Sequence, residues 1–234
     1  MRHNEFIRGI REVSPMMLGF IPLGLVLGAQ ASQKGMLFYE IGLLTGLNFA
    51  GGSEFAAVNL WTHPLAISVI VAVSMLINSR HIIMGVALSL YMKQISRLKS
   101  LGLLFFMTDE VWAMNLADAQ KRPEKAISIP YYMGTALSLY VMWISSSMIG
   151  AYIGPFVGDL EKYGFDMSFT AIFLVMLKGM WKSFKLARPW FVSLLVAGFV
   201  YHTVEGAWYV LAGALSGILS AYLWHRGESK GETL

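Results

Sequence analysis

Three short polar stretches interrupt the long apolar segments of this 234-residue chain. They read NFAGGSEFAAV at 48–58, NSRHIIMG at 78–85 and TDEVWA at 108–113. An arginine stays protonated at any working pH, whereas imidazole and carboxyl groups can gain and lose protons. Such residues could bind a charged solute and carry protons in exchange for it. The candidate binding or coupling residues are Gly51, Gly52, Ser53, Glu54, Asn78, Arg80, His81, Asp109 and Glu110.

Arg80 places a permanent charge in the middle of an apolar segment. A charge at the centre of a bilayer costs roughly 2.5–3.5 kcal/mol on insertion scales, so it needs a partner. We expect that partner to be Asp109 or Glu110, one segment later, or Glu54, one segment earlier. The alternative is a buried ion pair that only fixes helix packing, but small residues suffice for packing in membranes. The number of costly groups therefore favours a site in an interior cavity.

Gly51 and Gly52 break the second apolar segment in its interior. Glycine lets the backbone unwind and approach a ligand closely. The freed N–H and C=O groups could then bind the carboxylate and the ammonium group of an amino acid. The alternative is a helix crossing point, where glycine serves only close packing. Ser53 and Glu54, directly after the glycines, favour a binding site.

The composition is that of an integral membrane protein. Hydrophobic residues make up 56% of the chain and charged residues only 14%, whereas soluble domains have about 25% charged residues. We expect one membrane domain over residues 1–234, in contact with lipids and without a soluble catalytic domain. The net charge of +4 fits basic residues in short cytoplasmic loops better than a nucleic-acid partner. The absence of cysteine excludes thiol chemistry, and we expect no metal and no cofactor.

About eight hydrophobic segments predict an all-α polytopic fold, and several of the segments are discontinuous. Broken helices at membrane depth occur where they are buried in protein or line a watery cavity, and in transporters they form substrate sites. Charged residues near the segment ends can instead reach the lipid headgroups. We assign that simpler explanation to Glu40, Asp118, Lys178 and Glu205. The segments are 15–33, 35–60, 64–91, 100–117, 130–154, 167–181, 189–204 and 206–224.

Two arrangements of these segments remain open. Eight full crossings would place the basic loop 93–99 outside, against the rule that positive charge stays in the cytoplasm. The second arrangement has six full spans and two re-entrant hairpins and removes this conflict. In it, segment 35–60 enters the membrane from outside and returns, and segment 100–117 enters from inside and returns. Hairpins of opposite sense would be compatible with inverted repeats. Both arrangements predict a multi-pass protein of the cell membrane with its N- and C-termini in the cytoplasm.

The three polar stretches, in this order, resemble the AzlC/YgaZ family, the large subunit of branched-chain amino acid exporters. The opening SPMMLGFIPLGLVLG at 14–28 is also similar to the first segment of that family. The resemblance covers most of the chain. It implies export of leucine, isoleucine or valine, coupling to the proton gradient, and a small hydrophobic partner subunit of the AzlD/YgaH type.

Glu54 departs from the family pattern, which usually has Gln at this position. A carboxyl group can change its protonation, whereas an amide cannot. We therefore expect Glu54→Gln to fold and to bind substrate, with an altered pH dependence of transport. If Glu54 instead binds the substrate ammonium directly, the affinity itself should fall.

Other functions remain as alternatives. The chain could carry another small amino acid or solute, or import it, or it could be a structural subunit whose partner transports. An intramembrane enzyme could use His81, Asp109 and Glu110 as acid–base groups. The chain has no cysteine, no nucleophile elbow and no HExxH motif, so we expect a transporter and not an enzyme.

Overall fold

The computed structural model describes residues 2–157, 174, 178, 181, 183–204 and 208–231, and the regular secondary structure of these residues is entirely α-helical. The predicted all-α fold is thereby confirmed. Most of the predicted segment 167–181, and Glu205, lie outside the described residues. The helices are α1 (Arg2–Gln33), α2 (Phe38–Asn48), α3 (Gly51–Asn59), α4 (Ile67–Asn78), α5 (Arg80–Ser89), α6 (Arg97–Phe105), α7 (Asp109–Lys121), α8 (Ile129–Val157), α10 (Phe184–Thr203) and α11 (Trp208–Gly231).

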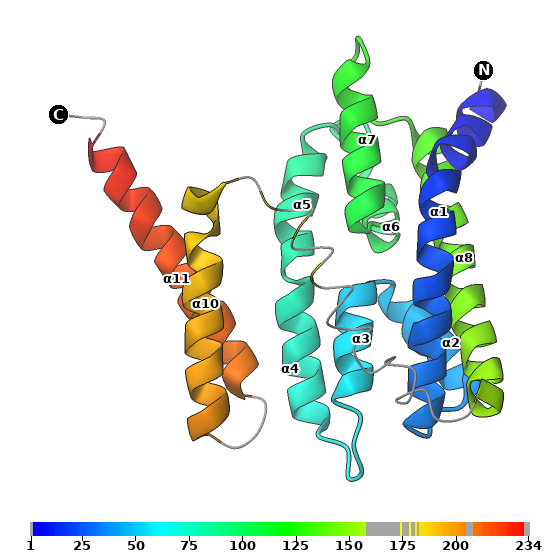
Figure 1. Ribbon diagram of the computed structural model, residues 1–234. Coiled ribbons are helices and arrows are strands. Elements are labelled where there is room, and N and C mark those ends of the chain that lie inside the picture. The colour runs from blue at the N-terminus through cyan, green and yellow to red at the C-terminus, as the bar shows by residue number, and fades with distance from the viewer. Residues whose placement is uncertain are drawn as a thin grey trace.

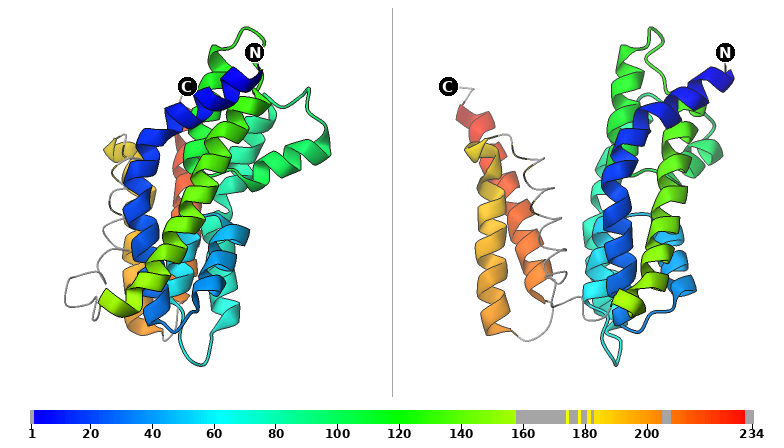
Figure 2. Two further views of the ribbon diagram at one scale, coloured as in Figure 1. Left: turned by 90° about the vertical axis from the view of Figure 1, so that its right-hand side faces the viewer. Right: turned by 45° about the vertical axis from the view of Figure 1, so that its right-hand side comes forward.

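Helices α1 and α8 pack side by side along most of their length and form the most extensive helix pair of the described residues (Figures 1 and 2). Glycines let the two backbones meet. A methyl group on Gly28 would lie 1.9 Å from the carbonyl oxygen of Ser147, and one on Gly150 would lie 2.1 Å from that of Leu25. Because lipid is as apolar as a leucine side chain, such close contacts between small residues are what holds helices together in a membrane.

Four short helices form two hairpins that enter the bundle from opposite ends. Helix α2 has 11 residues and α3 has 9, so each is about half as long as the roughly 30 Å of a hydrocarbon core. The α2–α3 hairpin lies at the end of the molecule where α1 finishes, and the α6–α7 hairpin lies at the end where α1 begins (Figures 1 and 2). This geometry supports the predicted arrangement with two re-entrant hairpins of opposite sense.

Each hairpin has a defined tip in the middle of the bundle. At the first tip, Phe49 takes a left-handed backbone conformation, with φ 44° and ψ 48°, and its N–H donates to the carbonyl oxygen of Thr45. At the second tip, Thr108 begins α7, and its side-chain oxygen accepts a hydrogen bond from the N–H of Val111. Such an N-cap satisfies one of the free donors of a first helical turn.

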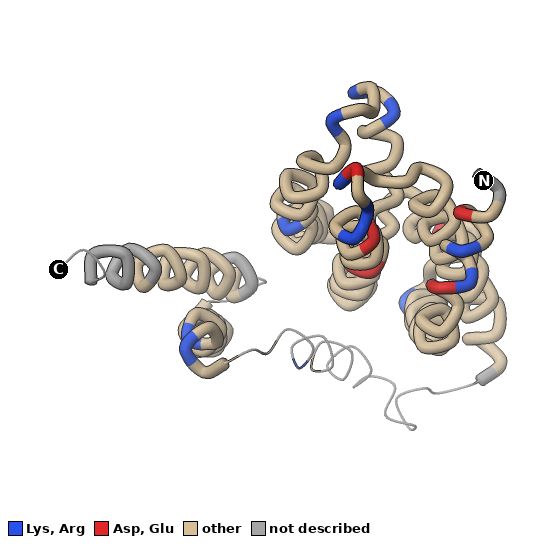
Figure 3. Tube along the Cα trace, turned by 90° about the horizontal axis from the view of Figure 1, so that it is seen from above, with Lys and Arg blue, Asp and Glu red and all other residues tan. Residues whose placement is uncertain are grey.

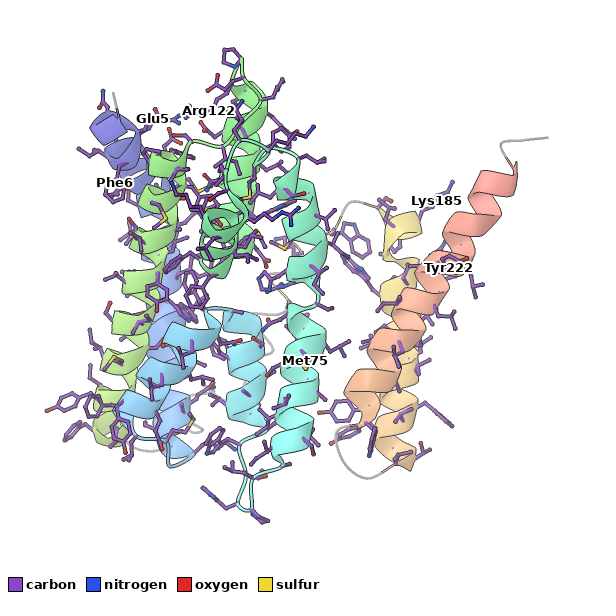
Figure 4. All side chains as sticks on the ribbon, turned by 180° about the vertical axis from the view of Figure 1, so that it is seen from behind. Glu5, Phe6, Met75, Arg122, Lys185 and Tyr222 are labelled. Atoms are coloured by element: carbon purple, nitrogen blue, oxygen red, sulfur yellow. The ribbon has the colours of Figure 1, made fainter. Side chains whose placement is uncertain are left out.

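Helices α4 and α5 form one span of 23 residues that is interrupted only at Ser79. The Ser79 hydroxyl donates to the carbonyl oxygen of Leu76 at 2.6 Å. The outer face of this span is strongly apolar: Met75, labelled in Figure 4, and Ile83 are 71% and 76% exposed. Exposed side chains of this kind fit a lipid-facing surface.

Helices α10 and α11 pack against each other on the far side of α4 and α5 from the α1–α8 pair (Figure 1). Within the described residues, four helices are long and apolar enough to cross a membrane: α1, the α4–α5 span, α8 and α10. The apolar part of α11, Ala212–Trp224, is shorter. The beginning of α1 and the end of α11 lie at the same end of the molecule. Their cytoplasmic location and the total number of crossings stay predictions.

Candidate functional site

A cavity of about 460 Å³ lies where both hairpin tips meet the interruption of the α4–α5 span. Helices α1 and α8 close it from the other side. The N-terminal ends of α3 and α7 both reach its wall, through Gly51 and Gly52 in one case and Asp109 and Glu110 in the other. First-turn N–H groups have no acceptor within their own helix and carry a partial positive charge. This arrangement can receive an anionic group at the glycine-lined tip.

One wall of the cavity carries an ion pair. Nη1 of Arg80 lies 2.8 Å from Oδ2 of Asp109, and both residues line the cavity. The predicted pairing of Arg80 with an acidic residue one segment later is confirmed, and the partner is Asp109. The two side chains are 33% and 32% exposed, so the pair is accessible from the cavity rather than sealed in the packing.

Several buried polar atoms of this wall have no hydrogen-bond partner among the described residues. They are Nε of Arg80, Nε2 of His81 and Oδ1 of Asp109, together with Oδ1 of the neighbouring Asn78. A buried polar group without a partner typically costs about 1–3 kcal/mol, and native structures have few of them. Their concentration at one cavity indicates a place for a polar ligand.

The rest of the lining is mainly apolar and includes Phe20, Phe49, Phe55, Leu139 and Trp143, which we call the aromatic wall. The cavity is therefore amphipathic, because its lining contains both charged groups and aromatic rings. A solute with a charged head and a hydrophobic side chain would fit both walls, and the volume lies within the usual range of about 300–1,000 Å³ for small-molecule sites.

Ser53, Glu54 and Asn78 do not line the cavity, although the sequence placed them in the site. Ser53 and Glu54 are fully buried, and Glu54 accepts hydrogen bonds from the N–H of Ala50 and from Nε1 of Trp143. Successive helical residues point about 100° apart, so Gly51 and Gly52 face the cavity while the next two residues point into the protein. Six of the nine predicted residues are brought together at the cavity, and three lie behind it.

A chain of side-chain hydrogen bonds connects this region behind the cavity. Nδ2 of Asn78 donates to Oδ1 of Asn48 at 3.0 Å, and Nδ2 of Asn48 donates to the hydroxyl of Ser53 at 2.7 Å. The Ser53 hydroxyl in turn donates to the carbonyl oxygen of Ala50 at 2.9 Å. The chain ties the first hairpin to the end of α4. Asn48 was not predicted to take part.

The aromatic wall was also missed by the sequence analysis. Trp143 and Phe20 stand in largely apolar stretches, where nothing in the local pattern separates a cavity-lining ring from one that faces lipid. Within the described residues, no cluster of three or more metal-ligating side chains occurs.

Charged residues also meet at one end of the bundle, in a group that we call the end cluster: Glu5, Arg8, Asp118 and Arg122. Asp118 accepts from Arg8 at 2.7 Å and from Arg122 at 2.6 Å, and Arg122 also pairs with Glu5. Glu5 and Arg8 belong to α1, Asp118 belongs to α7 and Arg122 follows it directly. Figure 3 shows acidic and basic positions along the tube seen from this end, and Glu5 and Arg122 are labelled in Figure 4. Partial burial lowers the pKa of Arg122, but its hydrogen bonds with Asp118 and Glu5 raise that pKa above the ordinary value overall.

The end cluster corrects the explanation given to Asp118. Its side chain is only 12% exposed and is held between two guanidinium groups, so it does not reach freely toward headgroups. Glu40 likewise has a local role, since it accepts a hydrogen bond from the N–H of Leu37 at the start of α2.

The fold and the cavity define a class: a helical membrane protein whose discontinuous helices surround an amphipathic central cavity. The family model described as "AzlC protein" matches residues 15–157, which is more than half of the chain and includes every predicted site residue. The chain therefore belongs to the AzlC family, as the resemblance indicated.

Individual relatives are distant but cover much of the chain. The inner membrane protein YgaZ of Escherichia coli is 26% identical over 183 residues, 78% of this chain and 72% of the relative. The branched-chain amino acid transport protein AzlC of Bacillus subtilis is 25% identical, covering 71% of this chain and 64% of the relative. An uncharacterized membrane protein of Archaeoglobus fulgidus is 27% identical over 74% of each chain. No solved structure matches the chain.

Proposed function

We propose that the chain is the transport domain of an exporter of branched-chain and similar hydrophobic amino acids in the cell membrane. The observation that carries this proposal is the amphipathic cavity, which offers fixed charges and aromatic rings to the same small solute. The name of the Bacillus subtilis relative supports the choice of branched-chain amino acids.

The substrate would lie with its charged end at the ion pair. Its carboxylate binds to Arg80 and to the N–H groups at the start of α3, and its ammonium group lies near Asp109 and Glu110. The hydrophobic side chain rests against the aromatic wall. Each part of an amino acid then meets a group of complementary chemistry.

Proton coupling would follow from competition for Arg80. The substrate carboxylate and Asp109 are both anions that bind the same guanidinium group. When the substrate binds, Asp109 loses part of its contact with Arg80, and when the substrate leaves, the two side chains pair again. The ionic contacts of this wall thus depend on whether substrate is bound, and coupling to a proton gradient requires such a dependence.

A small hydrophobic subunit of the AzlD/YgaH type would complete the transporter. We expect the chain to be recovered in larger amounts when the two are co-expressed. Full transport by the purified chain alone would contradict the need for this partner.

The direct test is counterflow in liposomes that contain both subunits. With unlabelled leucine inside and an imposed pH gradient, labelled leucine should accumulate, and valine and isoleucine should compete while lysine should not. Arg80→Gln should abolish accumulation. The matched control is Arg97→Gln, which removes an exposed arginine far from the cavity lining and should leave accumulation intact. Accumulation no greater than in empty liposomes would overturn the proposal.

A further inference from the structure

Glu54 is a fully buried carboxyl group whose two oxygens both accept hydrogen bonds. Oε1 accepts from the backbone N–H of Ala50 at 3.0 Å, and Oε2 accepts from Nε1 of Trp143 at 2.7 Å. The first bond fixes the tip of the α2–α3 hairpin, and the second reaches across to α8. Neither oxygen is directed to the cavity, which Glu54 does not line.

Trp143 is the residue through which Glu54 can affect the cavity. Its indole forms part of the aromatic wall and has three close neighbours. Glu54 accepts its N–H, Phe20 meets it edge to face at 6.5 Å, and a methyl group on Gly51 would lie 3.2 Å from its Cζ2 atom. These contacts hold the ring in one position, and a change in any of them should move it.

We propose that Glu54 is a positioning residue that fixes the indole of Trp143 and thereby sets which hydrophobic side chain the cavity accepts. This inference rests on the proposed function, because it assumes that the aromatic wall receives the substrate side chain. It assigns Glu54 neither to proton transfer nor to the substrate ammonium group.

The chemistry of the two bonds makes the carboxylate hard to replace. Both partners of Glu54 are N–H donors, and a carboxylate presents an acceptor to each of them. Glutamine has one acceptor oxygen and one NH₂ group, so one of the two donors would face another donor. Glu54→Gln should therefore loosen either the hairpin tip or the indole, although its volume is nearly unchanged.

Fluorine NMR tests the positioning without any substrate. The full-length chain is labelled with fluorotryptophan in lipid nanodiscs, and Trp143→Phe identifies the signal of Trp143 among the seven tryptophans. In Glu54→Gln this signal should shift or split while the other signals remain. Ser53→Ala is the matched control, since Ser53 is equally buried on the same helix but bonds to Ala50 and Asn48 instead. An unmoved Trp143 signal in Glu54→Gln overturns the positioning role.

Binding of amino acids with graded side chains tests the effect on selectivity. Affinities for alanine, valine, leucine, methionine and phenylalanine are measured for wild type, Glu54→Gln, Trp143→Phe and the double variant. The preference of leucine over phenylalanine should change by roughly tenfold in each single variant, the scale on which pockets discriminate by size. The double variant should show no further change, because both substitutions act on one ring. Additive changes in the double variant would contradict action through Trp143.

Gly51→Ala provides an independent variant in case Glu54→Gln does not fold. It presses on the indole near Cζ2 and leaves the Glu54 side chain chemically unchanged. It should move the same fluorine signal and change the same preference, and an unchanged signal and preference would overturn the link between the indole position and selectivity. If wild type binds none of the amino acids, the proposed function fails together with the selectivity claim, whereas the NMR result still decides whether Glu54 positions Trp143.

Discussion

The α1–α8 pair and the cavity wall show two opposite ways of building inside a membrane. Along α1 and α8, glycines bring the backbones into contact, as at Gly28 and Gly150, where the nearest atoms of the facing helix belong to its backbone. Around the cavity, helices break and ionisable groups accumulate, with Arg80 and Asp109 paired but still open to the cavity. At these glycines the helices pack through backbone contact and not through charge, and the accumulation of charge at the cavity supports the proposed binding site.

The comparison also distinguishes two reasons why a position in this protein requires glycine. At Gly28 the space that a side chain would need is occupied by the backbone of a neighbouring helix. At Gly51 it is filled by an aromatic ring that itself lines the cavity, so a small change there can be accommodated by movement of the ring. The first kind of glycine is needed for folding and the second for the shape of the site.

The largest effect is expected at the α1–α8 contact. Gly28→Val places side-chain atoms where the Ser147 carbonyl already lies, so the helices must separate. We expect a loss of about 3 kcal/mol or more in the free energy of unfolding, or no folded protein at all. Denaturant unfolding in detergent measures it.

Gly198→Ala serves as its control, because a methyl group there meets nothing within 4 Å. Equal stability of the two variants would show that the glycine contact does not hold α1 and α8 together.

A smaller effect is expected at the ion pair. Arg80→Gln leaves Asp109 without its partner, and because both side chains are about one third exposed we expect a loss of about 2 kcal/mol, below the roughly 3–5 kcal/mol typical of sealed pairs. Adding Asp109→Asn should restore much of the folded yield, measured by fluorescence-detected size-exclusion chromatography. Adding Glu110→Gln should restore less, since Arg80 pairs with Asp109. Equal rescue by both would mean that the charge is shared over the whole wall.

The smallest effect concerns the hydrogen-bond chain behind the cavity. Asn48→Ala removes the link between Asn78 and Ser53 and should lower the unfolding temperature by the equivalent of about 1 kcal/mol. Asn59→Ala is the comparison, because the exposed Asn59 only donates to Phe55 within its own helix. If the two substitutions lower the free energy of unfolding equally, the chain of hydrogen bonds contributes no more than one local hydrogen bond.

The sequence predicted those features that depend on charge and on breaks in apolar patterns. The basic loop around Lys93 suggested the two hairpins, and the cost of burying Arg80 pointed to an acidic partner. The sequence could not show which residues of a helix face the cavity and which face the protein interior. Gly52 and Ser53 are adjacent, yet one lines the cavity and the other points into the protein.

Contacts between distant parts of the chain could not be predicted from the sequence either. Arg8 and Asp118 are 110 positions apart, and the sequence analysis explained Asp118 only by its place near the end of its own segment. Trp143 stands among apolar residues, so neither its bond to Glu54 nor its place in the cavity wall left a signal in the local pattern.

The turn at Phe49 gives the first hairpin an unusual balance between backbone and side chain. A left-handed conformation costs a non-glycine residue roughly 1–2 kcal/mol, which glycine would avoid. The phenylalanine ring offsets this strain, because it meets Tyr140 edge to face at 5.0 Å and also lines the cavity. Backbone strain and ring contacts thus oppose each other at one residue. The tip therefore stores a small amount of backbone strain, and a movement of the hairpin that frees the ring would recover part of the free energy that it costs.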